Sequence, residues 1–252
     1  NIPAVQAFVG SQTANFIGNA LDTKVSIGRI DLGLLNRVII DNVRIDDQAN
    51  KKLLTATRLS AKISFTDLAK GGITISSAQI FGLDANIYRK DEKSNTNLQF
   101  IIDALASKDT TKTKKPLNLE IGSLVIRHGK VRYNQLDSPD YRLTSLKHID
   151  LSDISAHIIL NRLTNDSINL NIKKLALKDK SGLQLRDFKL RAIASKKKAE
   201  IDKLYIALPK SEINIDKAIA TYDAKDSKSL LPSLQYEAEM EHSHVYLPDL
   251  AA

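Results

Sequence analysis

Two histidines near the end of the chain are the residues whose types and spacing come closest to a metal site. His242 and His244 are two positions apart, so on a β-strand both imidazoles point to one side, near Glu239 and Glu241. Imidazole and carboxylate groups together could bind a transition metal. The alternative is a pair of solvent-exposed histidines that needs no ligand, and we favour that interpretation.

Neighbouring carboxylates, the other potential source of chemistry, are not arranged to act together. Asp46-Asp47 and Asp91-Glu92 are adjacent in polar turns, and adjacent side chains on an extended segment point to opposite sides. The sequence contains no phosphate-binding, dinucleotide-binding, nucleophile-elbow or HExxH motif, and it has no cysteine. We therefore predict that the chain is not an enzyme and has neither a cofactor nor a bound metal.

The composition is that of a globular chain with a basic surface. Of the 252 residues, 42% are hydrophobic and 26% are charged, which is too apolar for a disordered segment. The net charge of +8 suits an anionic partner, but the alternative, that it keeps a sheet protein soluble, is the one we favour. Both ends of the sequence look like points at which a longer sequence was cut. We expect a fragment of a longer protein, with any anchor or signal before Asn1.

Hydrophobic periodicity divides the chain into a short helical start and a long β region. Residues 1–22 carry apolar side chains at helical spacing, which predicts an amphipathic helix that packs on a sheet or, alternatively, lies on a membrane. Over residues 23–252 the apolar period falls to two, which predicts strands. A helical insert is expected at about 97–107, with Asn95 or Asn97 as its cap, and a basic loop follows at 108–115.

The predicted strands share one repeated pattern, apolar-x-x-apolar-x-apolar, which is clearest at Ile40-Asp41-Asn42-Val43-Arg44-Ile45. Further copies start at Ile75, Ile121, Leu146, Ile172, Leu185 and Ile201. An extra residue in a strand would move all later side chains to the other face unless a β-bulge or a tight corner absorbs it. Because bulges bend a strand, the repeat predicts a mainly β fold: an elongated, curled antiparallel sheet that forms a groove.

The apolar face of this sheet is the predicted binding surface. The helices expected from the sequence are too short to cover so many strands, and a large uncovered apolar surface usually binds something. Its lining is aliphatic and nearly free of aromatic rings, which suits acyl chains and disfavours nucleobases or carbohydrates. The predicted lining residues are Ile40, Val43, Ile45, Ile75, Ile80, Ile121, Leu124, Ile126, Ile172, Leu175, Leu177, Leu185, Phe188, Leu190, Ile201, Leu204 and Ile206.

The first third of the chain resembles the start of TamB/AsmA-like bacterial envelope proteins, most closely those of the Bacteroidetes TamB type. The likeness is carried by Val25-Ser26-Ile27-Gly28-Arg29-Ile30, by residues 36–47 around Val43-Arg44-Ile45, and by the turn and alternating strand at 52–63. Residues 73–80 resemble the next strand of that family. The rest of the chain is similar to the family in its general residue pattern but not in specific motifs. None of the matching motifs is catalytic.

This resemblance implies a location and a role. It implies an inner-membrane anchor ahead of the chain and a periplasmic body shaped as a β-groove, or β-taco, in a Gram-negative bacterium. The implied function is phospholipid transport between the inner and outer membranes during outer-membrane biogenesis, with acyl chains in the groove and no nucleic acid as partner. The alternative is a structural or partner-binding β module that assists outer-membrane protein assembly or secretion. The family's region for binding an outer-membrane barrel protein is not recognisable here.

Overall fold

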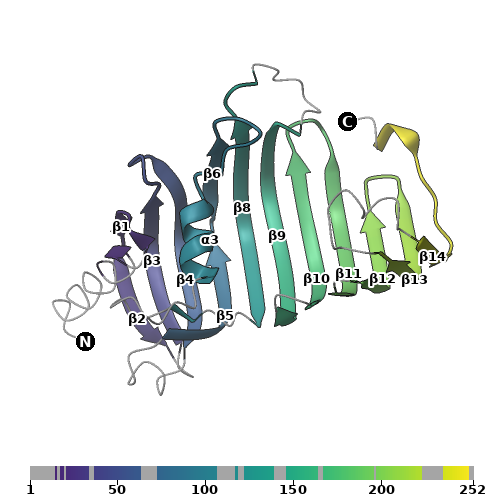
Figure 1. Cartoon of the computed structure of the whole chain (residues 1–252), viewed down its shortest axis with the longest axis horizontal. Coiled ribbons are helices and arrows are strands. Elements are labelled where there is room, and N and C mark those ends of the chain that lie inside the picture. Colours follow the sequence, from purple (N-terminus) through teal and green to yellow (C-terminus); the bar gives the residue numbers. More distant parts are fainter. Residues whose placement is uncertain are drawn as a thin grey trace. The chain divides into compact units, whose positions relative to one another are not determined.

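The computed structural model describes residues 15, 18–19, 21–33, 37–63, 73–106, 117–118, 122–138, 146–163, 167–195, 197–222 and 235–249. They form a mainly β chain with a large mixed sheet and little helix (Figure 1). The predicted helix at 1–22 lies outside the described residues apart from isolated positions near its end, and the basic loop at 108–115 lies outside them entirely. The chain divides into two compact units: residues 1–121 with 125–153, and residues 122–124 with 154–252.

The first unit is built on strand β3. Antiparallel pairs join β3 to β1, β2 and β4, and β4 in turn pairs with β5 and β6. Its elements are β1 (Val25–Ser26), β2 (Arg29–Gly33), β3 (Arg37–Asp46), β4 (Lys52–Ile63), β5 (Ile73–Phe81), β6 (Asp84–Arg89), α3 (Gln99–Ala106), β7 (Leu117–Asn118), most of β8 (Ser123–Gln135) and the start of β9 (His148–Leu163).

The prediction of a purely antiparallel sheet is wrong in this unit. β6 pairs with β8 in parallel, and so does β5 with β7. Parallel neighbours need a long crossover connection between them. The chain between Arg89 and Ser123, which contains α3, provides this crossover for β6 and β8.

The predicted helical insert is confirmed as α3, which lies over strands of the first unit (Figure 1). Its expected cap is wrong. Asn97 lies two residues before the helix, and its side-chain amide instead accepts a hydrogen bond from the Tyr88 N–H and donates one to the Asn86 carbonyl. These bonds fasten the segment before α3 to strand β6.

The repeated pattern in this unit marks a row of left-handed backbone positions. Asn42, Gly82, His128 and Asp153 have φ angles of 55°, 65°, 53° and 52°. Asn42, Gly82 and Asp153 occupy the third position of apolar-x-x-apolar-x-apolar segments that start at Ile40, Ile80 and Leu151, and His128 stands two residues after Ile126, where Gly129 takes the place of the next apolar residue. Asn, Gly, Asp and His are the residues that best tolerate this conformation. The strands therefore turn at a common row, which we call the crease.

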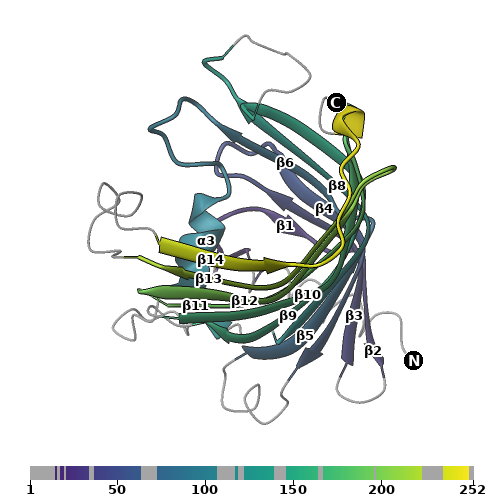
Figure 2. The ribbon, with the colours of Figure 1, turned by 90° about the vertical axis from the view of Figure 1, so that its right-hand side faces the viewer.

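The second unit is an antiparallel meander. After the rest of β9 come β10 (Ser167–Asp179), β11 (Gln184–Ser195), β12 (Lys198–Ala207), β13 (Glu212–Thr221) and β14 (Gln235–Met240), followed by a 3₁₀ turn at Leu247–Asp249. From β10 onward each strand pairs antiparallel with the next. Figure 2 shows that β10 to β13 are bent along their length.

The same sequence pattern produces β-bulges in the second unit. Between Ile172 and Leu175, β10 advances three residues while β11 advances two, and a further shift follows before Leu177. Strand β12 gains a residue between Lys203 and Ile201, opposite the single step from Arg191 to Ala192. The predicted use of bulges to keep the apolar side chains on one face is confirmed for these copies.

Two other predicted copies of the pattern, those starting at Leu146 and Ile75, do not match the strands in the structure. Leu146 is 83% exposed in the turn before β9, so the copy starting there is wrong, and the kink of β9 comes later, at Asp153. Ile121 lies outside the described residues. In the copy starting at Ile75, the left-handed residue falls after its end, at Gly82. The pattern alone does not show where in a strand the irregular residue lies, because several overlapping six-residue segments satisfy it.

Candidate functional site

Cross-strand pairs assemble a continuous apolar surface on one side of the second unit. Residues that face each other across an antiparallel pair lie on the same face of the sheet. One row reads Ile172, Leu190, Leu204, Ile215 from β10 to β13, and the next reads Leu175, Phe188, Ile206, Ile213. A third row is Leu170, Ala192, Ile201, Ala218. We call this surface the aliphatic face.

The aliphatic face is not covered by the described part of the chain. Within strands β10 to β14 no described side chain is buried, and the aliphatic residues of the three rows are half-buried. The side chains of a packed two-layer core would be almost fully buried. A contiguous apolar surface that stays accessible is typical of a binding site.

The opposite face of the same strands is polar. Three pairs of successive polar residues at irregular steps of β10, β12 and β13 are exposed there: Lys173-Lys174, Asp202-Lys203 and Asp216-Lys217. Arg191 forms an ion pair of 2.7 Å with Asp202, and Lys189 forms one of 3.0 Å with Asp187. The sheet is therefore amphipathic across its thickness, with solvated charges on one side and aliphatic side chains on the other.

Seven of the predicted lining residues lie in the rows of the aliphatic face: Ile172, Leu175, Phe188, Leu190, Ile201, Leu204 and Ile206. Two more, Leu177 and Leu185, face each other across β10 and β11 next to the pair of Leu175 and Phe188. Sequence reasoning missed the contribution of β13. Its copy of the pattern, starting at Ile215, has alanines at the second and third apolar positions, Ala218 and Ala220. Small apolar residues at the same spacing were the signal that could have found it.

The other predicted residues lie elsewhere. Ile40 pairs with Leu59, which pairs with Ile80, so these form an apolar row in the first unit. Val43 is buried, with 5% of its surface exposed, as part of a small core that includes Leu53 and Ala56. Ile45, Leu124 and Ile126 are half-buried strand residues, and Ile75 lies in β5 opposite Ile63. Ile121 is not among the described residues.

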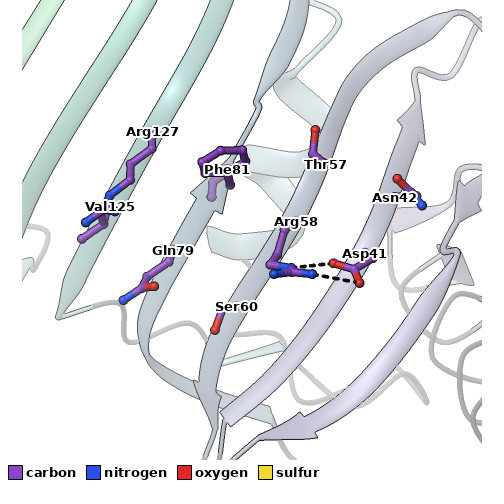
Figure 3. A pocket seen from close by; sticks show the side chains of 10 residues that line it. Asp41, Asn42, Thr57, Arg58, Ser60, Gln79, Phe81, Val125 and Arg127 are labelled. Carbon is purple, nitrogen blue, oxygen red and sulfur yellow. Dashed lines mark hydrogen bonds and ion pairs between the residues drawn. The ribbon is translucent and has the colours of Figure 1, made fainter.

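A hollow of about 570 Å³ opens on the first unit beside the crease (Figure 3). Arg58 reaches across from β4 to hold Asp41 of β3 with two hydrogen bonds of 2.7 and 3.3 Å. The hydrogen bond from Arg58, more than its charge, holds the pKa of Asp41 below its usual value. Phe81 and Arg127 line the hollow alongside this pair, and α3 lies behind the strands. Arg58 therefore engages both oxygens of the Asp41 carboxylate.

The two adjacent acids predicted not to form a catalytic pair have separate partners. Asp46 accepts a hydrogen bond from Arg44, whereas Asp47, 2% exposed, accepts from the backbone N–H groups of Ala49 and Lys51 at 2.9 Å. Tyr88 and the Asn97 amide complete the shell of Asp47 at 2.8 and 3.3 Å. Every bond is structural: this carboxylate fastens the loop after β3 to β6.

The histidine pair is not assembled into a metal site. His244 is bound through its backbone to Glu212, and β14 ends before His242. In the parts of the chain that the structure describes, no three His, Asp or Glu side chains gather closely enough to hold a metal ion. None of the described helices has the length and hydropathy to cross a membrane.

No model of a protein family matches the sequence, and no curated protein is significantly similar to it.

Proposed function

We propose that the chain is a lipid-binding segment whose aliphatic face holds phospholipid acyl chains. One observation carries the proposal: over β10 to β13, rows of paired aliphatic side chains remain half-buried, with no described element packed on them. Each methylene group of a bound chain that leaves water for such a surface gains about 0.8 kcal/mol. Aliphatic walls without hydrogen-bonding groups fit an acyl chain and supply no specificity for a polar ligand.

The difference between the polar face and the aliphatic face of β10 to β13 supports the proposal that this sheet forms a groove. Bulges at Lys173-Lys174 and Asp202-Lys203 add twist and bend to the strands, with the aliphatic side chains kept on one side. The proposed shape is an elongated curled sheet along which a lipid tail can slide, because a surface of equivalent aliphatic rows offers no single preferred position. In the proposed setting, a TamB/AsmA-like protein anchored in the inner membrane of a Gram-negative bacterium would pass phospholipids through the periplasm.

Photo-crosslinking tests the proposal with a matched control on the same strand pair. A benzoylphenylalanine is placed at Leu204, on the aliphatic face, or at Ile193, which is 53% exposed and alternates with Ala192 to the opposite face. Irradiation with vesicles of phosphatidylethanolamine and phosphatidylglycerol should attach phospholipid to the first variant only. Equal labelling of the two positions, or none at either, would show that the aliphatic face does not hold acyl chains.

Mass spectrometry of the purified chain gives an independent measurement. Organic extracts of the protein expressed in a Gram-negative bacterium should contain phospholipid, and substitution of both Leu175 and Leu204 by Asp should remove it. Circular dichroism must show that this variant keeps its β structure. A wild-type protein free of phospholipid would contradict the proposal.

A further inference from the structure

Phe81 is an apolar ring on a face of the first unit that carries charged side chains. Cross-strand pairing places Phe81 of β5 opposite Arg58 of β4, and Arg58 opposite Asp41 of β3, so these three side chains form one row. The aliphatic side chains of the neighbouring row project from the other face of the sheet. Phe81 is 45% exposed, and a phenyl ring in contact with water gains free energy when another apolar surface covers it.

Two contacts at the crease hold Phe81 beside strand β8. The rings of Phe81 and His128 meet with their centroids 5.0 Å apart and their planes at 64°, which is an edge-to-face arrangement. The N–H of Gly82 donates a hydrogen bond of 2.9 Å to the carbonyl of Arg127. In the sheet, β5 lies between β4 and β8. The ring of Phe81 and the backbone of Arg127 are therefore fixed next to each other.

The hollow beside Phe81 has the size and lining of a small-molecule site. Its volume of about 570 Å³ falls within the range of about 300–1,000 Å³ that is usual for ligand pockets. Ile80 and Val125 contribute apolar surface to the lining, and the exposed amide of Gln79 adds a hydrogen-bonding group. Apolar walls with a few polar groups are the usual composition of such a pocket.

Arg127 gives the hollow a positive charge that is free to pair with a ligand. Arg58 and Asp41, which also line the hollow, neutralise each other through their two hydrogen bonds. Arg127 is exposed, and its guanidinium forms no hydrogen bond or ion pair within the part of the chain that the structure describes. Figure 3 shows Phe81 between the two arginines. An oxyanion can therefore bind Arg127 without displacing another group.

We propose that this hollow binds a flat aromatic compound that carries a carboxylate. The aromatic body covers the exposed ring of Phe81, where contact between rings adds to the gain from burial. The carboxylate accepts two parallel hydrogen bonds from the planar guanidinium of Arg127, a geometry that arginine provides and lysine does not. The site belongs to the first unit, whereas the aliphatic face belongs to the second. It goes beyond lipid binding, and its test does not require that lipid binds.

Isothermal titration calorimetry with simple probes measures the binding. The probes are naphthoate, the neutral naphthamide of nearly the same shape, acetate, and dodecanoate. We expect naphthoate to bind at least about tenfold more tightly than naphthamide, because hydrogen bonds to a charged group are stronger than those to a neutral one. Acetate, which has the carboxylate without the ring, should give no measurable binding.

Three substitutions show where the probe binds. Arg127→Gln should weaken naphthoate binding at least about tenfold and abolish the preference for naphthoate over naphthamide. Phe81→Leu keeps an apolar side chain but removes the flat ring, and it should weaken binding at least about threefold. Arg186→Gln is the matched control: Arg186 is an exposed arginine of the second unit, so the chain loses the same charge far from Phe81 in sequence. Its affinity for naphthoate should stay within about twofold of wild type.

Several results would overturn the proposal. Naphthoate that does not bind, or binds no better than naphthamide, would show that no carboxylate is recognised. Equal losses in Arg127→Gln and Arg186→Gln would indicate general attraction to a basic chain, and unchanged binding by Phe81→Leu would show that its ring is not covered. If circular dichroism shows that Phe81→Leu does not fold, the two arginine variants decide the question.

Dodecanoate separates this site from the aliphatic face. It carries the same carboxylate on an acyl chain, so its binding reports on the proposed lipid surface and should be equal in the wild type and Arg127→Gln. Dodecanoate that binds while naphthoate does not would remove the aromatic site and leave the proposed function intact. The reverse result would retain the aromatic site and count against lipid binding.

Discussion

The phenol oxygen of Tyr88 lies 2.8 Å from Oδ2 of Asp47 and donates a hydrogen bond to it across 41 residues of sequence. Asp47 belongs to the loop after β3, and Tyr88 to strand β6. Asn97, just before α3, donates to the same carboxylate oxygen. A buried charge is stable only when hydrogen bonds replace its water. These bonds therefore join a loop, a strand and the approach to the helix into one rigid corner of the first unit.

Removing the phenol should measure the strength of this corner. Tyr88→Phe leaves the nearly buried carboxylate with one donor fewer, and a hydrogen bond to a charged group contributes about 1.5–3 kcal/mol. We expect urea unfolding to show a loss of this order. Tyr236→Phe is the matched control, because Tyr236 is 80% exposed on β14; its stability should change by less than about 0.5 kcal/mol. Equal effects of the two substitutions would contradict the structural role of Tyr88.

Asp47 should also make the first unit sensitive to acid. Burial alone would raise its pKa, but hydrogen bonds from the Lys51 N–H, Tyr88, Asn97 and the Ala49 N–H outweigh burial and hold the pKa below its ordinary value. The stabilisation by Asp47 is therefore fully present above its unfolded pKa of about 3.9 and is lost as the pH falls through the lower folded value.

The measurement is the free energy of unfolding between pH 5 and pH 2, from urea titrations of the wild type and Asp47→Asn. The wild type should lose stability more steeply towards low pH than the variant, because only the wild type must protonate the carboxylate on unfolding in acid. Tyr88→Phe should have an intermediate slope. Parallel curves for all three proteins would show that the carboxylate of Asp47 carries no folding-linked proton.

Tyr88 should titrate later than an ordinary tyrosine. Burial, and then its hydrogen bond to the Asp47 carboxylate, raise the pKa of Tyr88 to about 12. Since the folded value is the higher one, its contribution to stability is complete below about pH 10 and is lost as the pH rises through about 12. The difference in ultraviolet absorbance between wild type and Tyr88→Phe during alkaline titration isolates this phenol among seven tyrosines. A midpoint near 10 would contradict the structure.

The crease should be sensitive to the residue type at its left-handed positions. Asn42 has a φ of 55°, which a β-branched side chain adopts only with strain. Asn42→Val should therefore lose about 1–2 kcal/mol, whereas Asn42→Gly should stay within about 0.5 kcal/mol of wild type. Urea unfolding of the two variants gives the comparison. A valine variant as stable as the glycine variant would mean that the backbone at this position is not held in the left-handed region.

Gly82 offers a second, separable test of the crease. A Cβ atom at this position would collide with the Oγ1 atom of Thr57, and its φ of 65° disfavours alanine as well. Gly82→Ala should destabilise the chain, and Thr57→Ala in the same chain should restore only the part due to the collision. A double-mutant cycle by urea unfolding separates the two terms. Strict additivity of the two substitutions would show that Thr57 and residue 82 do not touch.

The sequence predicted the class of fold and the chemistry of its two faces, because these depend on local periodicity. Alternation fixed which residues share a face, and the i, i+3, i+5 spacing indicated bulges, as at Ile172 and Leu175. Local periodicity could not predict the parallel pairing of β6 with β8, because this pairing depends on the strand beside which the chain re-enters the sheet after a crossover of more than thirty residues. It also missed the corner around Asp47, since hydrogen bonds between Asp47, Tyr88 and Asn97 join positions that no periodicity relates.

Whether the aliphatic face is open to solvent or is a packed core can be tested by measuring how much a charged residue on it destabilises the chain. Leu204 is half-buried on this face, and Ile193 projects from the opposite one. If the face is open, Leu204→Asp keeps its carboxylate in contact with water and should cost about 1–2 kcal/mol, only modestly more than Ile193→Asp; in a closed core the cost would exceed about 3 kcal/mol. Urea unfolding without lipid measures both. Phospholipid vesicles should then stabilise the wild type and the Ile193→Asp chain but not the Leu204→Asp chain, because a ligand stabilises only the folded form that binds it. A Leu204→Asp chain that fails to fold, beside a stable Ile193→Asp chain, would instead show that the aliphatic rows are a packed core and that the proposed binding surface does not exist.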